Sequence, residues 1–340
     1  MKKLKHADRE AADAPEFNSR NACMLRIQLS LRVGLTLIRG CAGRLGAAYG
    51  TARVAFAFWR SNANRLSSPS YLDFNLVGYL HFHLMPLTLD LSKQVALVTG
   101  ASGQLGRVMA LTLARCGAEV AIHYRSERTS AENLKSEIEA LGVRALVVQA
   151  DVTDLSSLSA MREQIVAALG APDIVVANAV AQIFPWTTVL EESVADYESQ
   201  FRTCVMQNVL LAKVFIPAMI AKGRGRYIGI NTECSMQMLP TQSAYVAGKR
   251  GMDGVLRVLA KEVGSHKITV NQVAPGWTVS EQDRANGTEH RPDYEANVPL
   301  GRRGTDQEVA NVVAFLASDL ASFITGAFVP VCGGNVMPTI

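Results

Sequence analysis

The stretch that decides the fold reads Val95-Ala-Leu-Val-Thr-Gly-Ala-Ser-Gly-Gln-Leu-Gly106. It begins with a short apolar run, passes through three glycines and continues into a helical pattern over residues 105–116. A short apolar run without alternation is typical of a strand that is buried on both faces. A strand, a glycine-rich turn and a helix in this order predict the first βα unit of a parallel sheet.

The same alternation of short apolar runs and helical stretches continues to the C-terminus. Further strands are predicted at residues 120–124, 145–149, 174–177, 226–230, 268–273 and 327–331. Further helices are predicted at residues 131–141, 156–169, 197–221, 243–263 and 307–317. We therefore predict an α/β fold: a doubly wound parallel sheet of the Rossmann type in a single domain, with a ligand crevice at the carboxyl ends of its strands.

Each glycine of the turn serves a separate purpose. Gly100 allows the tight turn out of the strand, Gly103 lets the backbone approach a phosphate, and Gly106 lets the helix pack closely on the sheet. The pyrophosphate of a dinucleotide would then lie at the positive end of the helix. The turn therefore predicts a nucleotide-binding site.

Tyr245 and Lys249 stand four residues apart in the predicted helix 243–263. Side chains at positions i and i+4 lie one above the other on the same helix face. A lysine ammonium beside a phenol favours the phenolate, so we expect Lys249 to lower the pKa of Tyr245 from about 10 toward neutrality. The pair predicts a general acid/base at Tyr245. The alternative is a surface helix that carries an unrelated tyrosine and lysine.

The first quarter of the chain differs from the rest in charge. Residues 1–84 carry 12 Lys/Arg and 5 Asp/Glu, whereas the remaining residues carry 22 and 25. The basic character therefore belongs to this segment, and we expect no nucleic-acid binding by the remainder. We interpret residues 1–84 as an extension outside the functional fold, such as a misassigned start upstream of Met85, with the catalytic domain at residues 85–340. A targeting segment and a genuine appended element are the alternatives.

The cysteines and the lengths of the apolar runs indicate the compartment and argue against a metal site and a membrane span. Free thiols in a reducing cytosol are the simplest interpretation of the cysteines, so we expect a cytoplasmic protein without a metal site. No uncharged run reaches the roughly 20 apolar residues of a membrane span, so we expect no membrane association. The six cysteines form no CxxC pair and stand at positions 23, 41, 116, 204, 234 and 332.

Taken together, these features resemble the short-chain dehydrogenase/reductase family, and within it the 3-oxoacyl-carrier-protein reductases. The resemblance covers residue 89 to the C-terminus and implies a soluble enzyme that interconverts a ketone and a secondary alcohol with NAD(P). The further matching pieces are Asp151-Val152, Ala177-Asn-Ala179, Asn208, Asn271-Gln-Val-Ala-Pro-Gly276, Pro299-Leu-Gly-Arg302, Phe315-Leu-Ala-Ser-Asp319, Thr325-Gly326 and Gly333-Gly334.

Three features depart from the family pattern. The middle glycine of the turn usually stands where Gln104 is, and Gly103 supplies it one place earlier. Ala177 and Val180 replace the outer residues of the usual Asn-Asn-Ala-Gly. The catalytic serine usually lies 13 residues before the tyrosine, at the position of Thr232. Threonine keeps the hydroxyl group but is stiffer at χ1, so we expect Thr232 to serve, with Ser235 as the nearby alternative.

The resemblance implies a role for each catalytic residue. Tyr245 would exchange a proton with the carbonyl or alcohol oxygen of the substrate, and Thr232 would donate a hydrogen bond to that oxygen. Lys249 would lower the pKa of Tyr245 and hold the ribose of the nicotinamide nucleotide. Asn208 would orient a water molecule that connects Lys249 to solvent.

The resemblance also implies which residues bind the cofactor. At the end of the second strand, where an acidic residue would bond the ribose 2′-hydroxyl of NAD, Tyr124 is followed by Arg125. A guanidinium suits a 2′-phosphate, so we expect NADP(H) to be favoured over NAD(H), with Ser126 and Arg107 in support. The expected cofactor-binding residues are Gly100, Ser102, Gly103, Gln104, Leu105, Gly106, Arg125, Asp151, Val152, Asn178, Ala179, Tyr245, Lys249, Pro275, Gly276 and Thr278.

The leading hypothesis is therefore an NADP(H)-dependent oxidoreductase, 3-oxoacyl-reductase-like, that acts on a small carbonyl or alcohol substrate. A sugar or polyol and a steroid-type alcohol remain open as substrates, because lid loops set substrate choice. The polar stretch 280–297 after Trp277 predicts such a loop. A non-catalytic NAD(P)-binding protein is the alternative from another class. Two long helices, 197–221 and 243–263, and an apolar C-terminal stretch predict a homotetramer or homodimer.

Overall fold

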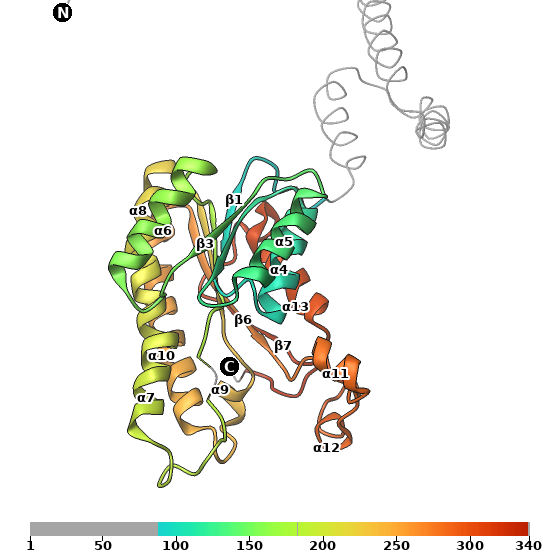
Figure 1. The fold of residues 1–340 in the computed structure, drawn as a ribbon. Helices are drawn as coiled ribbons and strands as arrows, with labels where there is room; N and C mark the ends of the chain where they lie inside the picture. Colours follow the sequence, from blue (N-terminus) through green and yellow to red (C-terminus); the bar gives the residue numbers. More distant parts are fainter. Residues whose placement is uncertain (1–87, 182, 339–340) are drawn as a thin grey trace, which may run out of the picture. The chain divides into compact units, whose positions relative to one another are not determined.

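The computed structural model describes residues 88–181 and 183–338. The predicted extension 1–84, the expected domain start at Met85 and the terminal Ile340 lie outside the described residues. The described residues form one seven-stranded sheet, with helices on both of its faces (Figure 1). Every neighbouring pair of strands is parallel, and the strand order is β3-β2-β1-β4-β5-β6-β7. The predicted doubly wound parallel sheet is confirmed.

The elements follow the predicted alternation, and their ends differ from the predicted ends by only a few residues. The strands are β1 (Val95–Val98), β2 (Glu119–Tyr124), β3 (Ala145–Gln149), β4 (Ile174–Ala177), β5 (Gly225–Ile230), β6 (Ile268–Pro275) and β7 (Phe328–Val331). The helices that pack on the sheet are α4 (Gln104–Arg115), α5 (Arg128–Glu139), α6 (Leu155–Ala168), α8 (Gln207–Lys222), α10 (Ser243–Val263) and α13 (Asp306–Ala317).

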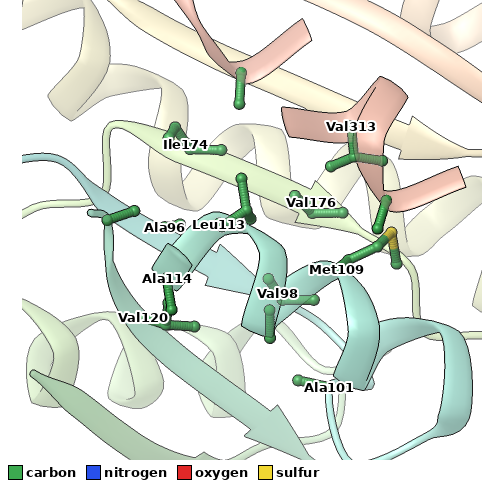
Figure 2. Packing of buried hydrophobic residues seen from close by; sticks show 14 of the residues in the cluster. Ala96, Val98, Ala101, Met109, Leu113, Ala114, Val120, Ile174, Val176 and Val313 are labelled. Carbon is green, nitrogen blue, oxygen red and sulfur yellow. The ribbon is translucent and has the colours of Figure 1, made fainter. Parts of the chain in front are cut away.

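Two apolar layers hold the helices to the sheet. Helices α4, α5 and α13 cover one face, and α6, α8 and α10 cover the other (Figure 1). Figure 2 shows the first layer, in which Met109 and Leu113 of α4 pack against the side chains of β1 and β4. Met109 and Leu113 are fully buried. Burial of apolar surface on both faces explains why the strands consist of unbroken apolar runs.

The predicted helix 197–221 is three segments in the structure. A short helix, α7 (Val194–Gln200), leads into a π-helical segment, η3 (Phe201–Met206), and then into α8. By length and composition the whole stretch Val194–Lys222 could cross a membrane. Its α8 part is a core helix, however, because Leu211, Phe215 and Met219 are buried in the second apolar layer.

The predicted loop 280–297 contains two short helices, α11 (Glu281–Asn286) and α12 (Pro292–Glu295). Ser280 caps α11 in a reciprocal capping box with Asp283. The buried guanidinium of Arg303 donates to the carbonyl oxygens of Thr278 at 2.6 Å and of Glu289 at 3.1 Å, and to the Asp283 carboxylate at 2.8 Å. One buried cation therefore connects Thr278 before α11, Asp283 of α11 and Glu289 after it.

His123 of β2 joins the glycine turn to the neighbouring strand end. Its Nδ1 accepts a hydrogen bond from the Gly100 N–H at 2.9 Å, and its Nε2 lies 3.1 Å from the carbonyl oxygen of Ala150. Nδ1 can accept only when it carries no proton, so these contacts require the neutral ring protonated on Nε2. Burial lowers the pKa of His123 from 6.5 to about 4. The glycine turn is therefore held by an uncharged histidine.

We expect His123 to make stability fall in acid. The unfolded chain binds the proton more tightly than the folded protein, so the free energy of unfolding decreases as the pH falls through 6.5 toward about 4. The loss from this group reaches roughly 3 kcal/mol at the acid end. Denaturant titrations of wild type and His123→Asn across this range measure it, because asparagine can accept the Gly100 bond without titrating. The exposed His266→Asn is the control, and an equal pH dependence in all three proteins would contradict the prediction.

Candidate active site

One cleft of about 510 Å³ lies at the carboxyl ends of the strands. It is lined by every predicted cofactor-binding residue and by Thr232, Tyr245 and Lys249. The strand order reverses between β1 and β4, and the residues that follow these two strands form its middle. This is the topological switch point, where doubly wound sheets bind ligands.

The middle of the cleft is fixed by close contact between the glycine turn and the end of β4. A Cβ atom on residue 106 would lie 2.2 Å from the Gly100 carbonyl oxygen, so only glycine lets α4 begin here. The Thr99 hydroxyl accepts hydrogen bonds from the N–H groups of Asn178 and Ala179 at 2.9 and 3.0 Å. The Asn178 amide donates to the Thr99 carbonyl oxygen at 2.9 Å. Asn178 therefore holds the turn from the side.

The start of α4 suits a phosphate group. Gly103 is the N-cap residue and supplies no side-chain cap, and the first turn of α4 contains no acidic residue. The first N–H groups of a helix have no partner within the helix, and the helix dipole adds positive potential there. The cradle formed by Gly100, Gly103 and Gly106 therefore fits the pyrophosphate of a dinucleotide.

Asp151 and Arg125 lie at the nucleoside end of the cleft. One oxygen of the Asp151 carboxylate accepts hydrogen bonds from the N–H and the hydroxyl of Thr153 at 2.8 and 2.7 Å. These bonds and the nearby Arg125 guanidinium lower the pKa of Asp151, which therefore stays ionised. Helix α6 is capped by Asp154, so Asp151 is not needed as its N-cap. Arg125 is exposed on the cleft rim.

Thr232 and Tyr245 bring two hydroxyl groups together at the opposite end. Thr232 follows β5 and is buried, and a hydrogen bond between its side chain and Tyr245 lowers the pKa of Tyr245. Desolvation acts more strongly in the opposite direction and raises the pKa of Tyr245 above its ordinary value. Ser235 is turned away, since its hydroxyl donates to the Thr232 carbonyl oxygen at 2.8 Å. The geometry favours Thr232 over Ser235.

The expected lowering of the Tyr245 pKa by Lys249 is not what the structure shows. The Lys249 ammonium donates to the Ile230 carbonyl oxygen at 2.6 Å and lies 5.7 Å from the centre of the Tyr245 ring. Burial also lowers the pKa of Lys249 itself. The spacing of four residues correctly placed both side chains in the cleft. The pKa of Tyr245 is raised by burial, and burial depends on how the other helices and strands pack around this residue.

Asn208 does not line the cleft. It lies two residues after the π-helical segment, and its amide donates to the Cys204 carbonyl oxygen at 2.7 Å. Its side-chain oxygen accepts a hydrogen bond from the hydroxyl of the buried Tyr227 at 2.8 Å. The role that the resemblance implied for Asn208 is therefore not supported by its position. The residue from this part of the chain that does line the cleft is Thr203.

Cys204 is the neighbour of Lys249 that the sequence did not indicate. Burial raises the pKa of its thiol, and the Lys249 ammonium acts in the opposite direction. Gly248 explains the close packing, since a Cβ there would lie 3.0 Å from the Gln200 carbonyl oxygen and 3.2 Å from the Cys204 Cβ. π-helical segments often occur at functional sites. No pattern in the sequence marks the π turn that places Cys204 here.

Glu233 is a second residue that sequence reasoning missed. It is buried beside Thr232 and accepts hydrogen bonds from the Tyr294 hydroxyl at 2.8 Å, the Trp277 N–H at 3.2 Å and the Asn335 amide at 3.0 Å. Burial raises the pKa of this carboxyl group. Glu233 ties α12 and the C-terminal segment to the end of β5. Its only signal in the sequence is its place next to Thr232.

Comparison with known proteins identifies the family. Residues 100–335 match the family described as Enoyl-(Acyl carrier protein) reductase. The 3-oxoacyl-[acyl-carrier-protein] reductase FabG of Staphylococcus aureus is 36% identical over 242 residues, which are 71% of this chain and 98% of that protein. FabG of Pseudomonas aeruginosa is 37% identical over 249 residues, which are 73% of this chain and 100% of that protein.

The chain belongs to the short-chain dehydrogenase/reductase family. It is an oxidoreductase that interconverts a carbonyl and an alcohol with NAD(P). Among solved structures, acetoin dehydrogenase YohF from Salmonella typhimurium is 30% identical, with a TM-score of 0.64, and the match covers 71% of this chain and 96% of that one. The promiscuous reductase LugOII, which catalyses keto-reduction at C1 during lugdunomycin biosynthesis, is also 30% identical, with a TM-score of 0.67, over 73% and 99%.

Removing the hydroxyl group of Tyr245 or that of Thr232 should slow turnover. We expect Tyr245→Phe to retain less than about a tenth of the wild-type kcat, because the proton donor is lost. Thr232→Ala should lower kcat by roughly 10²-fold, and Thr232→Ser should stay active. Steady-state rates and NADPH affinity, measured for the same variants, distinguish a loss of catalysis from a loss of cofactor binding. Ser235→Ala is the matched control, and a greater loss in this variant than in Thr232→Ala would show that the hydroxyl is assigned to the wrong residue.

Proposed function

We propose that this chain is an NADP(H)-dependent reductase of ketones, with a 3-oxoacyl substrate as the first candidate. The observation that carries the proposal is the layout of one cleft. The phosphate cradle after β1 lies in the middle, Arg125 after β2 lies on one side of it, and Thr232 after β5, with Tyr245 and Lys249, lies on the other. The names of the FabG relatives support a 3-oxoacyl group as the first substrate to test.

In this proposal the cofactor supplies the hydride, and the protein supplies position and charge. Pro275, Gly276 and Thr278 border the end of the cleft where the nicotinamide would lie. Thr232 donates a hydrogen bond to the carbonyl oxygen, and Tyr245 gives that oxygen its proton. The raised pKa keeps Tyr245 protonated at neutral pH, which suits the direction of ketone reduction. Lys249 lies beside Tyr245 in the same cleft, where it would hold the ribose of the nicotinamide nucleotide.

The preference for NADP(H) rests on Arg125. Its guanidinium lies on the cleft rim near the Asp151 carboxylate and is available to a 2′-phosphate. Arg107 is less available, because it pairs with Glu137 at 2.6 Å and Glu281 at 3.5 Å. Tyr124 stands where an acidic residue would bond the ribose of NAD.

We expect the purified protein to consume NADPH when a ketone is added, with a higher kcat/KM for NADPH than for NADH. Arg125→Asp should lower the ratio of these two values by at least about tenfold, because a carboxylate repels the 2′-phosphate. Absorbance loss of the reduced cofactor is the measurement. Arg128→Asp, an exposed change on α5 outside the cleft, should leave the ratio unchanged. A wild type that prefers NADH contradicts the cofactor assignment, and NADPH binding without turnover of any ketone favours a non-catalytic protein.

We also propose a cytoplasmic homo-oligomer. The four cysteines within the described part of the chain, Cys116, Cys204, Cys234 and Cys332, are free thiols, which suits a reducing compartment. Phe201 of η3 and Val258 of α10 are more than half exposed, and Met337 is exposed in the C-terminal segment. Pairing of two copies across such apolar surface would remove it from water.

The proposed functional unit starts at Met85. The match covers nearly the whole length of the FabG relatives but only about three quarters of this chain, which supports a functional unit shorter than the full chain. A protein that begins at Met85 should therefore be oligomeric and at least as active as the full chain. Light scattering after size-exclusion chromatography and a specific-activity assay on both proteins test the prediction. Loss of folding or activity on truncation would show that residues 1–84 are a structural part.

A further inference from the structure

We propose that the substrate carries a flat apolar ring beside its carbonyl group and that Trp186 holds this ring. The inference rests on the proposed ketone reduction, because it takes Tyr245 as the group that meets the carbonyl oxygen. It keeps the ketone reduction but departs from the first candidate substrate that the relatives' names suggest: it places an aromatic or fused-ring ketone ahead of a linear 3-oxoacyl chain and of a polyhydroxylated ketone.

The Trp186 ring lies beside the Tyr245 ring, and the two rings together are called the aromatic wall below. The two ring centres are 6.4 Å apart, and the ring planes differ by 22°. Trp186 is 44% exposed, so a large part of its indole surface does not pack against the protein chain. Near-parallel aromatic faces favour another flat ring, because offset stacking adds to the burial of apolar surface. A ring bound on this wall would lie next to the Tyr245 hydroxyl.

Other exposed apolar side chains come from the segments around the same two hydroxyl groups. Phe184 precedes Trp186 by two residues and is 92% exposed. Met238 follows α9 (Cys234–Gln237), the short helix that begins two residues after Thr232, and is 56% exposed. Trp277 is 50% exposed, and its N–H is bonded to Glu233, the neighbour of Thr232. Such a set of side chains is typical of a binding site for an apolar ligand.

Glu233, Ser243 and Tyr197, which lie near the two hydroxyls, are already bonded within the protein. Both oxygens of the Glu233 carboxylate accept hydrogen bonds, from Tyr294 and Trp277 on one side and from Asn335 on the other. The Ser243 and Tyr197 hydroxyls are bonded to each other at 2.6 Å. A sugar or polyol needs several free partners for its hydroxyl groups, and unpaired polar groups are costly to bury. The arrangement therefore favours a ligand that presents carbon to these surfaces.

Four ketones and three proteins test the inference. The ketones are α-tetralone, butanone, a ketopentose and acetoacetyl-coenzyme A, each reduced with NADPH by wild type, Trp186→Ala and Trp186→Phe. We expect wild type to reduce α-tetralone with a kcat/KM at least about tenfold above that of the other three ketones. Trp186→Ala should lower the α-tetralone value about tenfold and change the butanone value less than about threefold. Trp186→Phe should keep most of the α-tetralone activity.

Controls separate a binding role from a folding defect. Phe323→Ala removes a fully exposed aromatic side chain that, unlike Trp186, does not stack on Tyr245, and it should change no value. NADPH affinity and the thermal unfolding midpoint should be unchanged in Trp186→Ala. Equal losses on α-tetralone and butanone, or a wild type that prefers the ketopentose or the linear thioester, would overturn the inference and leave ketone reduction standing. A wild type that reduces none of the four ketones overturns the proposed function and the inference together.

Discussion

The contact between Gly106 and the carbonyl oxygen of Gly100 is the constraint on which the site depends. A single methyl group at residue 106 would stand 2.2 Å from that oxygen, so α4 can start against the turn only if the residue there is glycine. This contact puts the uncapped N–H groups of α4 directly beyond the end of β1. The positive end of the helix therefore faces the point where the strand order reverses. A larger residue at this position would move the helix away from the sheet and open the phosphate cradle.

Polar contacts extend this constraint across the cleft. Asn178 at the end of β4 and His123 in β2 hold the turn from its two sides. Gln104 stands where the family usually has glycine, and its amide donates to the Asp306 carboxylate at 2.9 Å. Asp306 also accepts from Arg284 of α11 at 3.0 Å, so the departure at Gln104 connects the glycine turn to α11. The buried Asp306 carboxylate is the group that both donors share.

Burial shifts the pKa values of Tyr245 and Lys249 in opposite directions. It raises the pKa of Tyr245 and lowers the pKa of Lys249, because each charged form is harder to solvate there. The phenol therefore stays protonated at neutral pH, and Thr232 provides a hydrogen bond that acts against the shift. The Trp186 ring lies 6.4 Å from the Tyr245 ring, so the same tyrosine that burial affects also carries the aromatic contact on which the substrate proposal rests.

The sequence by itself determined the sheet, the glycine turn and the residues of the cleft. The hydrophobic period and the composition of a segment depend only on residues that are near in sequence. The strand at 145–149 and the helix at 243–263 were therefore predicted with the bounds that the structure has. The tertiary structure alone decided what depends on groups far apart in the chain. The π turn in η3 gives Cys204, rather than Asn208, the place beside Lys249, and packing around Tyr245 reverses the pKa shift that its spacing from Lys249 predicts. The stretch 280–297 was predicted as a polar loop, yet it contains two short helices, and the buried Arg303 donates to carbonyl oxygens before α11 and between α11 and α12. Local patterns specify elements, whereas burial and long-range hydrogen bonds exist only once those elements have packed.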